Sequence, residues 1–406
     1  MEDEELDAGE KEALHRRLSS AAPSVGGVRG PPGAGKTTVS AREIADAVSD
    51  KGEDVVVCAA QNATIDNWLL LVEDLLRKRG FPSSVIKRTG NLSKSSDRII
   101  SKFGTRNPDE IAKAKVVVVT FASSYVSTGE PLIAPGRFPR MVFDETGQAT
   151  PEQAWIPLAL AAEDHRTKVS VYGDENQLLP FSPDFIHELG VLGFLAKNSP
   201  SSIFTLPDSY RLMDRGVDLT STIFYNGKLD APPKVRARRL TLSKTPSGVL
   251  RDVLDPENTL VYLGVNGNER EEALSWDNPE QAKLTGTLVR AFLDHGVQSE
   301  RILLEATYRP HVGSINAVLA GTGIECSTVH KRLGAENDVA IYPTTRANKE
   351  RAWGIAAQKE LMNVATSREK TKLVIIGDSK ETFSEGTWLT RKMFRFIEQY
   401  GIVRYL

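Results

Sequence analysis

Cysteine is almost absent from this chain of 406 residues, which contains only Cys58 and Cys326. Two cysteines so far apart form no C-x-x-C pair, which excludes a structural zinc module. Long apolar runs are also lacking, since none approaches the roughly 20 residues of a membrane-spanning helix. The acidic start, Met1–Glu5, has neither the basic nor the apolar region of a targeting peptide. We therefore expect a protein of the cytosol or nucleus that is not associated with membranes.

Positive charge is not in excess either. The chain has 51 Lys and Arg residues and 53 Asp and Glu residues, which gives a formal net charge of -2. A protein that binds phosphates usually has a basic footprint, so any such footprint must be local here. Two clusters are candidates, with an ordinary solvated face as the alternative for each. They are Arg77–Arg79 with Lys87 and Arg88, and Lys234, Arg236, Arg238, Arg239 and Lys244.

Short β-branched runs alternate with helical stretches along most of the chain. The runs are Val55–Cys58, Val116–Val119, Met141–Phe143, Val169–Tyr172, Thr259–Leu263, Arg301–Leu304, Val339–Tyr342 and Lys372–Ile376. Continuous apolar runs of this kind are typical of buried parallel strands. We predict an α/β fold with two tandem, doubly wound, mostly parallel sheets. An acidic lead-in at 1–20 would precede domains at 21–205 and 206–406, which meet in a loop-rich stretch at 180–207.

A complete phosphate-loop pattern, G-x-x-x-x-G-K-[ST], is present at Gly30–Thr37. Its glycines would let backbone N–H groups surround an anion, while Lys36 reaches the β and γ phosphates and Thr37 ligates Mg²⁺. A helix should follow from Thr38 to Ile44. A chance glycine-rich turn is the alternative, which the lysine and threonine in register disfavour. The expected nucleotide-binding residues are Gly30, Pro31, Pro32, Gly33, Ala34, Gly35, Lys36, Thr37 and Thr38.

Two carboxylates, Asp144 and Glu145, follow the apolar run Met141–Phe143. A strand that ends there would place both beside the phosphate loop. We expect Asp144 to hold the magnesium and Glu145 to orient or deprotonate the attacking water. Gln177, in the segment that follows the next strand, would sense the γ-phosphate, with a plain polar turn as the alternative.

These segments resemble the motifs of superfamily 1 helicases, the Upf-like branch in particular. Asp144–Thr150 resembles motif II, and Gly173–Pro180 resembles motif III. Further similar segments follow in order: Val57–Asp66 (motif Ia), Ser209–Met213 with Phe224–Leu229, Ala306–Arg309, Thr328–Glu336 (motif V) and Asn363–Asp378 (motif VI). The resemblance covers residues 25–380 and implies that both domains are RecA-like P-loop domains.

The resemblance also implies roles for the matching residues. Arg211 and Arg368 would be arginine fingers on the γ-phosphate, with a surface ion pair as the alternative. Tyr210 would stack on the nucleobase, and Glu336 would contact the ribose. The implied strand-binding residues are Ala60, Gln61, Asn62, Thr120, Thr307, Tyr308, Thr328 and His330. Routine turns or caps are the alternative for the threonines, and a solvated loop histidine is the alternative for His330.

The implied mechanism uses ATP, or another NTP, with Mg²⁺ to draw the two domains together. The arginine fingers would gain contacts to phosphate only on closure, and alternating grip would move the protein along single-stranded RNA or DNA. The family branch implies 5′→3′ movement by a monomeric motor. Two other functions remain open: a nucleic-acid-dependent ATPase that remodels complexes without unwinding, and a nucleotide-switched binding module that hydrolyses poorly.

Four departures from the family pattern accompany the resemblance. No glutamine stands at Gly9–Leu14, where the family reads adenine, and Leu333 replaces the glutamine expected in motif V. Only residues 1–35 precede Lys36, which leaves no room for the β-barrel of Upf-like helicases. Residues 65–115 could form at most a reduced helical insert. A minimal motor, or a fragment of a longer protein, is therefore expected.

Overall fold

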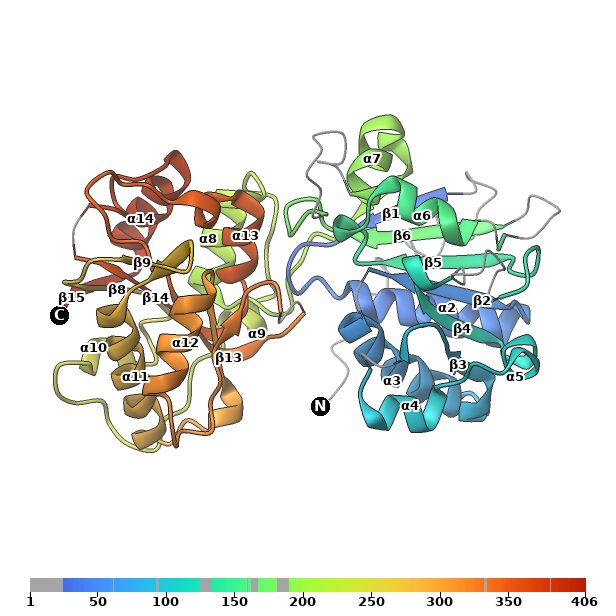
Figure 1. The fold of residues 1–406 in the computed structure, drawn as a ribbon, viewed down its shortest axis with the longest axis horizontal. Coiled ribbons are helices and arrows are strands. Elements are labelled where there is room, and N and C mark those ends of the chain that lie inside the picture. The colour runs from blue at the N-terminus through green and yellow to red at the C-terminus, as the bar shows by residue number, and fades with distance from the viewer. Residues whose placement is uncertain are drawn as a thin grey trace. The chain divides into compact units, whose positions relative to one another are not determined.

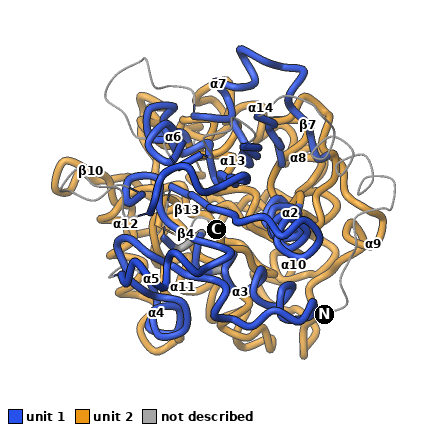
Figure 2. Tube along the Cα trace, turned by 90° about the vertical axis from the view of Figure 1, so that its right-hand side faces the viewer, with its two compact units in different colours: residues 1–30, 35–175, 179–206 blue, residues 31–34, 176–178, 207–406 orange. Residues whose placement is uncertain are grey.

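The structure is a computed structural model. It describes residues 25–60, 62–92, 95–124, 133–158, 160–161, 167–180, 190–331, 334–379 and 381–406. The chain divides into two compact units, shown in different colours in Figure 2 and described separately below. The first unit comprises residues 1–30, 35–175 and 179–206, and the second comprises 31–34, 176–178 and 207–406. Within the described ranges, no helix has the length and apolar character needed to cross a bilayer.

The first unit is built on a seven-stranded sheet with the order β3-β4-β2-β5-β6-β1-β7, and its paired strands are parallel. The strands are β1 (Val25–Arg29), β2 (Val55–Ala59), β3 (Ile86–Arg88), β4 (Val116–Thr120), β5 (Arg140–Asp144), β6 (Lys168–Gly173) and β7 (Ile203–Thr205). All residues of β2, β4 and β5 are buried, as the continuous apolar runs predict.

Helices flank this sheet (Figure 1): α2 (Lys36–Lys51), α3 (Asn62–Lys78), α4 (Asp97–Phe103), α5 (Pro108–Lys113), α6 (Pro151–Leu158) and α7 (Val191–Asn198). Residues of α5, α6 and α7 join alternate residues of the central strands in one hydrophobic core. On α3, Trp68 Nε1 donates a hydrogen bond to Ser40 Oγ of α2 at 3.0 Å. This bond joins the helix that follows the phosphate loop to its neighbour.

Two segments differ from the expectation. The stretch at 190–207, expected as loop, contains α7 and β7, and β7 pairs with β1 from Gly27 to Arg29. Its prolines flank these elements: Pro200 begins a 3₁₀ turn, and Pro207 follows β7. Residues 65–115 hold not only helices but also β3, an edge strand paired with β4. Only three residues long, β3 has no extended apolar run to predict it.

The second unit has a six-stranded sheet with the order β12-β11-β13-β14-β8-β15, again with parallel pairs. The strands are β8 (Leu260–Val265), β11 (Ile302–Ala306), β12 (Ser327–Thr328), β13 (Asn337–Pro343), β14 (Glu369–Asp378) and β15 (Ile402–Tyr405). A separate antiparallel hairpin consists of β9 (Arg270–Glu272) and β10 (Ser275–Asp277).

Helices cover both faces of this second sheet (Figure 1): α8 (Asp214–Phe224), α9 (Pro233–Arg236), α10 (Arg251–Leu254), α11 (Pro279–Asp294), α12 (Arg309–Val318), α13 (Lys359–Ala365) and α14 (Trp388–Tyr400). Successive strand residues point to opposite faces. Tyr262 and Ile375 accordingly pack with α8, α13 and α14, whereas Val261 and Val374 pack with α10, α11 and α12. The prediction of two doubly wound parallel sheets is confirmed.

Short 3₁₀ turns complete the two units. They are Ser83–Val85, Phe121–Ser123, Thr146–Gln148, Pro200–Ser202, Ser299–Arg301 and Gly354–Ala357.

Candidate nucleotide-binding site

The phosphate loop connects the end of β1 to the start of α2. Gly33 and Gly35 have φ values of 73° and 79°, in the left-handed region that glycine adopts without strain. Gly30 is glycine for another reason, since an added Cβ would collide with Cγ of Lys36. The Lys36 side chain folds back over the loop, and its Nζ donates to Gly30 O at 2.6 Å. A lysine ammonium has three donors, so two are left for phosphate oxygens.

The N-terminus of α2 supplies backbone donors at the same place. No side chain caps this end at Gly35. The first N–H groups of a helix have no intrahelical acceptor and attract anions. The amides of Lys36, Thr37 and Thr38 are therefore suited to a phosphate group. The nine residues predicted to bind nucleotide thus comprise the loop Gly30–Gly35 and the first three residues of α2, Lys36–Thr38.

The strand register brings other predicted residues to this edge of the sheet. Ala59 stands opposite both Thr120 and Asp144, and Arg29 stands opposite Gly173. The carboxyl ends of β4, β2, β5, β6 and β1 therefore meet along one edge. This is where open α/β sheets bind their ligands. Asp144 thus lies on the same edge as the phosphate loop.

Asp144 has the environment of a metal ligand. Its side chain is buried, Oδ1 accepts a hydrogen bond from the Glu145 amide at 2.9 Å, and Oδ2 has no hydrogen-bond partner among the described residues. Burial, together with the charge of Glu145, raises the pKa of Asp144 to about 7, against the opposing charge of Lys36. A divalent cation would satisfy the buried Oδ2, so the site fits such an ion.

The second expected ligand of the cation is the hydroxyl of Thr37, at the N-terminus of α2. In the described part of the chain, no cluster of three or more His, Cys, Asp or Glu side chains could hold a metal. A cation here would therefore take its remaining ligands from phosphate oxygens and water, as magnesium commonly does. Glu145 directly follows Asp144 at a φ of 50°, a strained backbone for a non-glycine residue.

A buried network, not anticipated from the sequence, attaches α2 to the sheet. Glu43 of α2 accepts hydrogen bonds from Arg140 at 2.7 Å, Ser170 at 2.6 Å and Tyr172 at 2.7 Å. Burial and the charge of Glu43 raise the pKa of Tyr172 well above its ordinary value, so the hydroxyl stays protonated and donates. The network joins the phosphate-loop helix to β5 and β6, which end beside the loop. The sequence feature that could have predicted this network is Glu43, a charged residue at an otherwise buried position of the helix.

Gln177 follows β6 and groups with the second unit. The side chain of Gln177 is half-buried. Its neighbour Asn176 accepts hydrogen bonds there from Lys359 Nζ at 2.8 Å and Asn363 Nδ2 at 2.7 Å. Asn363 is the first residue of the segment that resembles motif VI, so these bonds connect that segment with the predicted sensor segment.

The predicted arginine fingers both form ion pairs inside the second unit. Arg211 Nε lies 2.5 Å from Glu336 Oε2, and Lys370 Nζ lies 3.0 Å from the other oxygen of Glu336. Burial opposes ionisation of Glu336, but the two cations prevail and lower its pKa to about 2. Arg368 Nε lies 3.8 Å from Glu305, and both side chains are buried. The structure thus brings Arg211 and Glu336 together, in a pair that is only partly exposed.

Tyr210, predicted to stack on the base, is half-buried next to Arg211, and its carbonyl accepts from Arg238 at 2.8 Å. Glu305 was not singled out from the sequence. The sequence feature that could have drawn attention to Glu305 is its position as the single charged residue in the apolar run Ile302–Ala306.

The predicted strand-binding residues occupy the ends of strands, and several already have internal partners. In the first unit, Asn62 accepts a hydrogen bond from Arg88, and Thr120 donates to Ser123 Oγ at 2.8 Å. Ala60 follows β2 and is half-buried, while Gln61 lies outside the described residues, as does Leu333. The side chains of Asn62 and Thr120 are thus held in place by their neighbours.

In the second unit, Thr307 and Thr328 lie close together, because Thr328 stands opposite Ala306 in the sheet. The Thr307 hydroxyl lies 2.8 Å from Tyr342 OH, and the buried Tyr308 donates to Trp353 O at 2.9 Å. His330 is exposed. The Tyr308 ring is therefore part of the interior of the second unit.

Two RecA-like α/β units, one with a complete phosphate loop beside a buried aspartate, define a P-loop NTPase core. Two family models, each described as an AAA domain, match residues 5–215 and 190–380. The chain belongs to this family and, within it, to the Upf-like branch of the superfamily 1 helicases, which are NTP-hydrolysing enzymes. Proteins of this class use an NTP with a divalent metal.

Curated relatives align with most of this chain. The DNA polymerase alpha-associated DNA helicase A of Schizosaccharomyces pombe is 26% identical over 98% of this chain and 67% of its own length. DNA-binding protein SMUBP-2 of Rattus norvegicus is also 26% identical, over 98% of this chain and 45% of its own length. The Regulator of nonsense transcripts 1 homolog of Drosophila melanogaster is 24% identical over 93% and 34%. The chain thus spans between a third and two thirds of these relatives.

Proposed function

We propose that this protein is an ATP-dependent helicase or translocase that moves along single-stranded RNA or DNA, in the 5′→3′ direction. The observation that supports this most directly is the position of Asp144. Its buried, unpartnered Oδ2 lies on the sheet edge where the phosphate loop, Ala60 and Thr120 are found. A nucleotide site and a strand-binding site on the same edge of the sheet are joined by short segments of the chain. Binding at one site can therefore change binding at the other.

In this proposal the phosphate loop binds ATP, and Lys36 contacts the β and γ phosphates. Thr37 and Asp144 would hold Mg²⁺, which would supply positive charge next to the transferred phosphoryl group. Glu145 orients or deprotonates the attacking water, and Gln177 senses the γ-phosphate.

The second unit supplies the remaining roles. Arg211 and Arg368 stabilise the transition state on the γ-phosphate, Tyr210 stacks on the base, and Glu336 contacts the ribose. Glu336 holds Arg211 beside it, so nucleotide binding would require these two side chains to rearrange. The strand-binding residues in this proposal are Ala60, Gln61, Asn62, Thr120, Thr307, Tyr308, Thr328 and His330.

A strand-displacement assay tests this proposal. Duplexes with a single-stranded 5′ or 3′ overhang are incubated with the protein, ATP and Mg²⁺, with Glu145→Gln as the inactive control. Displacement from the 5′ overhang alone is the expected result. ATP-dependent stripping of a bound protein from the strand, without displacement, would instead indicate a remodelling ATPase and contradict the helicase proposal.

A further inference from the structure

The second unit contains a polar pocket of about 740 Å³, and part of its lining, Gly227–Leu229, belongs to the segment Phe224–Leu229 that resembles a helicase motif. Residues of α8, α9 and α14 line it, together with the segment Gly227–Asp230. None of the residues assigned above to nucleotide or strand is among its lining residues. Since α8 and α14 lie far apart in the sequence, their side chains could not be grouped from the sequence alone.

The pocket is basic although the chain as a whole is not. Five cationic and two acidic side chains line it, which gives a net charge of +3 in a chain of net charge -2. The cations are Arg215, Lys228, Arg236, Lys392 and Arg395. A concentration of positive charge in a cleft attracts anionic ligands.

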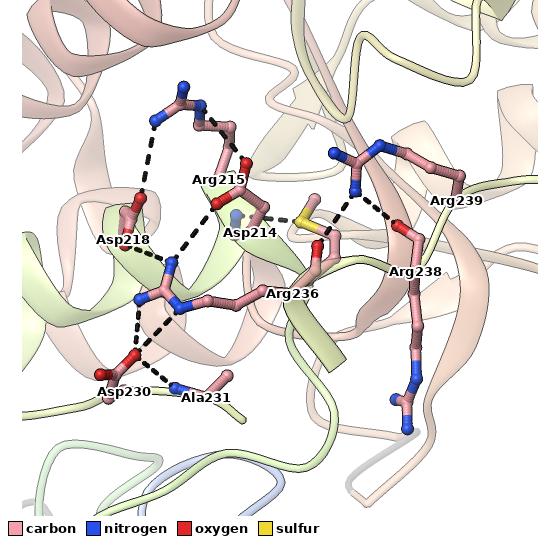
Figure 3. A network of polar contacts seen from close by, with 10 residues as sticks. Asp214, Arg215, Asp218, Asp230, Ala231, Arg236, Arg238 and Arg239 are labelled. Atoms are coloured by element: carbon pink, nitrogen blue, oxygen red, sulfur yellow. Dashed lines mark hydrogen bonds and ion pairs between the residues drawn. The ribbon is translucent and has the colours of Figure 1, made fainter. Parts of the chain in front are cut away.

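Arg236 forms ion pairs with the acidic groups at this site. Figure 3 shows its guanidinium among three carboxylates, with distances of 3.3 Å to Asp214, 2.9 Å to Asp218 and 2.6 Å to Asp230. Arg215 lies 3.7 Å from the second oxygen of Asp218. Both acidic side chains of the lining, Asp218 and Asp230, are therefore paired with arginine, which reduces their repulsion of an anion.

The other three cations have no acidic partner. Across the described residues, no carboxylate lies within ion-pair distance of Lys228, Lys392 or Arg395, and Lys228 and Arg395 are exposed. Lys392 donates to the Thr222 carbonyl at 3.0 Å and lies 5.1 Å from the Trp388 ring. These side chains can offer their charge to a ligand.

The basic clusters expected from the sequence share only Arg236 with the pocket, and many of their other charged groups have partners within the fold. Arg79 pairs with Asp46 at 2.6 Å, and Lys87 pairs with Glu110 at 2.7 Å. Arg239 donates to the carbonyls of Arg236 and Arg238 (Figure 3) and pairs with Glu257. Lys228, Lys392 and Arg395 of the pocket lie outside both clusters.

Aromatic side chains line the same pocket. Phe396 and Tyr400 line the pocket with ring centroids 4.8 Å apart, and Tyr400 is 44% exposed. The guanidinium of Arg215 lies 5.7 Å from the Tyr400 ring. Cations interleaved with exposed aromatic rings are the combination with which proteins hold single-stranded nucleic acids, through phosphates and stacked bases.

We propose that this pocket binds a segment of single-stranded nucleic acid, as a second contact beyond the strand-binding residues named above. Its volume suits a nucleotide with its flanking phosphates. Lys228 and Arg395 would contact the phosphates, and Tyr400 would stack on a base. An acidic peptide would use the cations but has no need of the stacking surface. The inference rests on the proposed strand-binding function and assigns a further part of its binding surface.

The test measures binding of labelled single-stranded DNA and RNA by fluorescence anisotropy over a range of salt concentrations. The variant is the double substitution Lys228→Ala and Arg395→Ala. Arg391→Ala serves as the matched control, because Arg391 is an exposed cation of the same helix that does not line the pocket. We expect roughly tenfold weaker binding and a salt slope smaller by about 1.4 for the double variant, since each phosphate contact on a single strand adds about 0.7 to the slope.

A second readout separates the pocket from the motor itself. NTP turnover at saturating strand should be unchanged in the double variant, while the strand concentration for half-maximal stimulation rises. Tyr400→Leu should weaken strand binding with little change in the salt slope. Strand binding equal to that of the unmodified protein would overturn the pocket assignment and leave the proposed function intact.

Two further outcomes would also be decisive. Unchanged strand binding together with weaker binding of a polyglutamate peptide would assign the pocket to an acidic peptide and overturn the inference. No strand binding by the unmodified protein would contradict the proposed function itself, and the pocket assignment with it.

Discussion

Arg140, at the start of β5, donates from Nη1 to Oε1 of Glu43 on α2 at 2.7 Å, and both side chains are almost completely buried. Arg140 also donates from Nε to Glu53 at 2.7 Å. Removing one partner of a buried ion pair leaves the other charge uncompensated. This pair therefore stabilises the position of the phosphate-loop helix on the sheet.

Arg140→Met should lower the free energy of unfolding by about 3–5 kcal/mol, the usual loss when a buried pair is broken. Urea denaturation measures it. Arg77→Met is the control, because Arg77 pairs with Asp74 on the surface, where such pairs contribute less than about 1 kcal/mol. Equal losses in the two variants would mean that the buried network does not hold α2.

Gly30→Ala should abolish tight nucleotide binding. An added Cβ at Gly30 would collide with the Lys36 side chain and displace its ammonium from the loop. Gly26→Ala, in the strand β1 that precedes the loop, is the matched control, because nothing lies within 4 Å of an added Cβ there. Fluorescent-nucleotide titration measures both affinities. Similar nucleotide affinities in the two variants would show that nucleotide binding does not depend on the position of the Lys36 side chain.

Glu145→Gln should retain nucleotide binding and lose hydrolysis. The amide keeps the shape of the side chain but cannot accept a proton from water, and loss of such a base costs about 10²–10⁴-fold in turnover. Chelation of the divalent metal should abolish turnover in the unmodified protein. Single-turnover kinetics with a separate binding measurement distinguish the two steps. Unchanged turnover in Glu145→Gln would remove Glu145 from the mechanism.

Glu369→Gln should change the pH dependence of stability. Burial raises the pKa of Glu369 from 4.5 to about 8, although Arg211 and Arg368 oppose the shift. The folded state then binds a proton more tightly than the unfolded state. The contribution of Glu369 to stability therefore falls as the pH rises from about 4.5 to about 8, by up to about 1.4 kcal/mol per pH unit.

The glutamine variant lacks this fall, so its stability relative to the unmodified protein should increase over the same pH range. Urea denaturation at several pH values tests this, with the exposed Glu398→Gln as the control. A stability difference that does not vary with pH would show that Glu369 titrates alike in the folded and unfolded chain.

The sequence predicts the parts of this fold that repeat a strong local pattern. Runs such as Val116–Val119 have no polar interruption and become buried strands. β1 was not predicted, because Gly26 and Gly27 interrupt its apolar run. An added Cβ at Gly27 would collide with the terminal methyl group of Ile203 on β7, so the Ile203 side chain would have to move. This close approach of strands distant in the sequence has no local signal.

The residues of the candidate site are likewise predicted where they are contiguous in the sequence and missed where they come from separate segments. The phosphate loop and Asp144 are recognised from contiguous residues, and the sheet register then places them on one edge. The partners of Glu43 come from separate segments of the chain, and so do the cations that line the pocket with Tyr400. Such groupings depend on how helices pack, which neither spacing nor composition records.

The central claim is that NTP hydrolysis at the phosphate loop is coupled to strand binding. Steady-state hydrolysis of ATP with Mg²⁺, measured with and without single-stranded RNA or DNA, tests it most directly, with Lys36→Ala as the control. We predict strong stimulation by at least one strand type and loss of turnover in the variant. Turnover that is unaffected by nucleic acid would contradict the coupling and leave an NTPase without a strand-driven cycle.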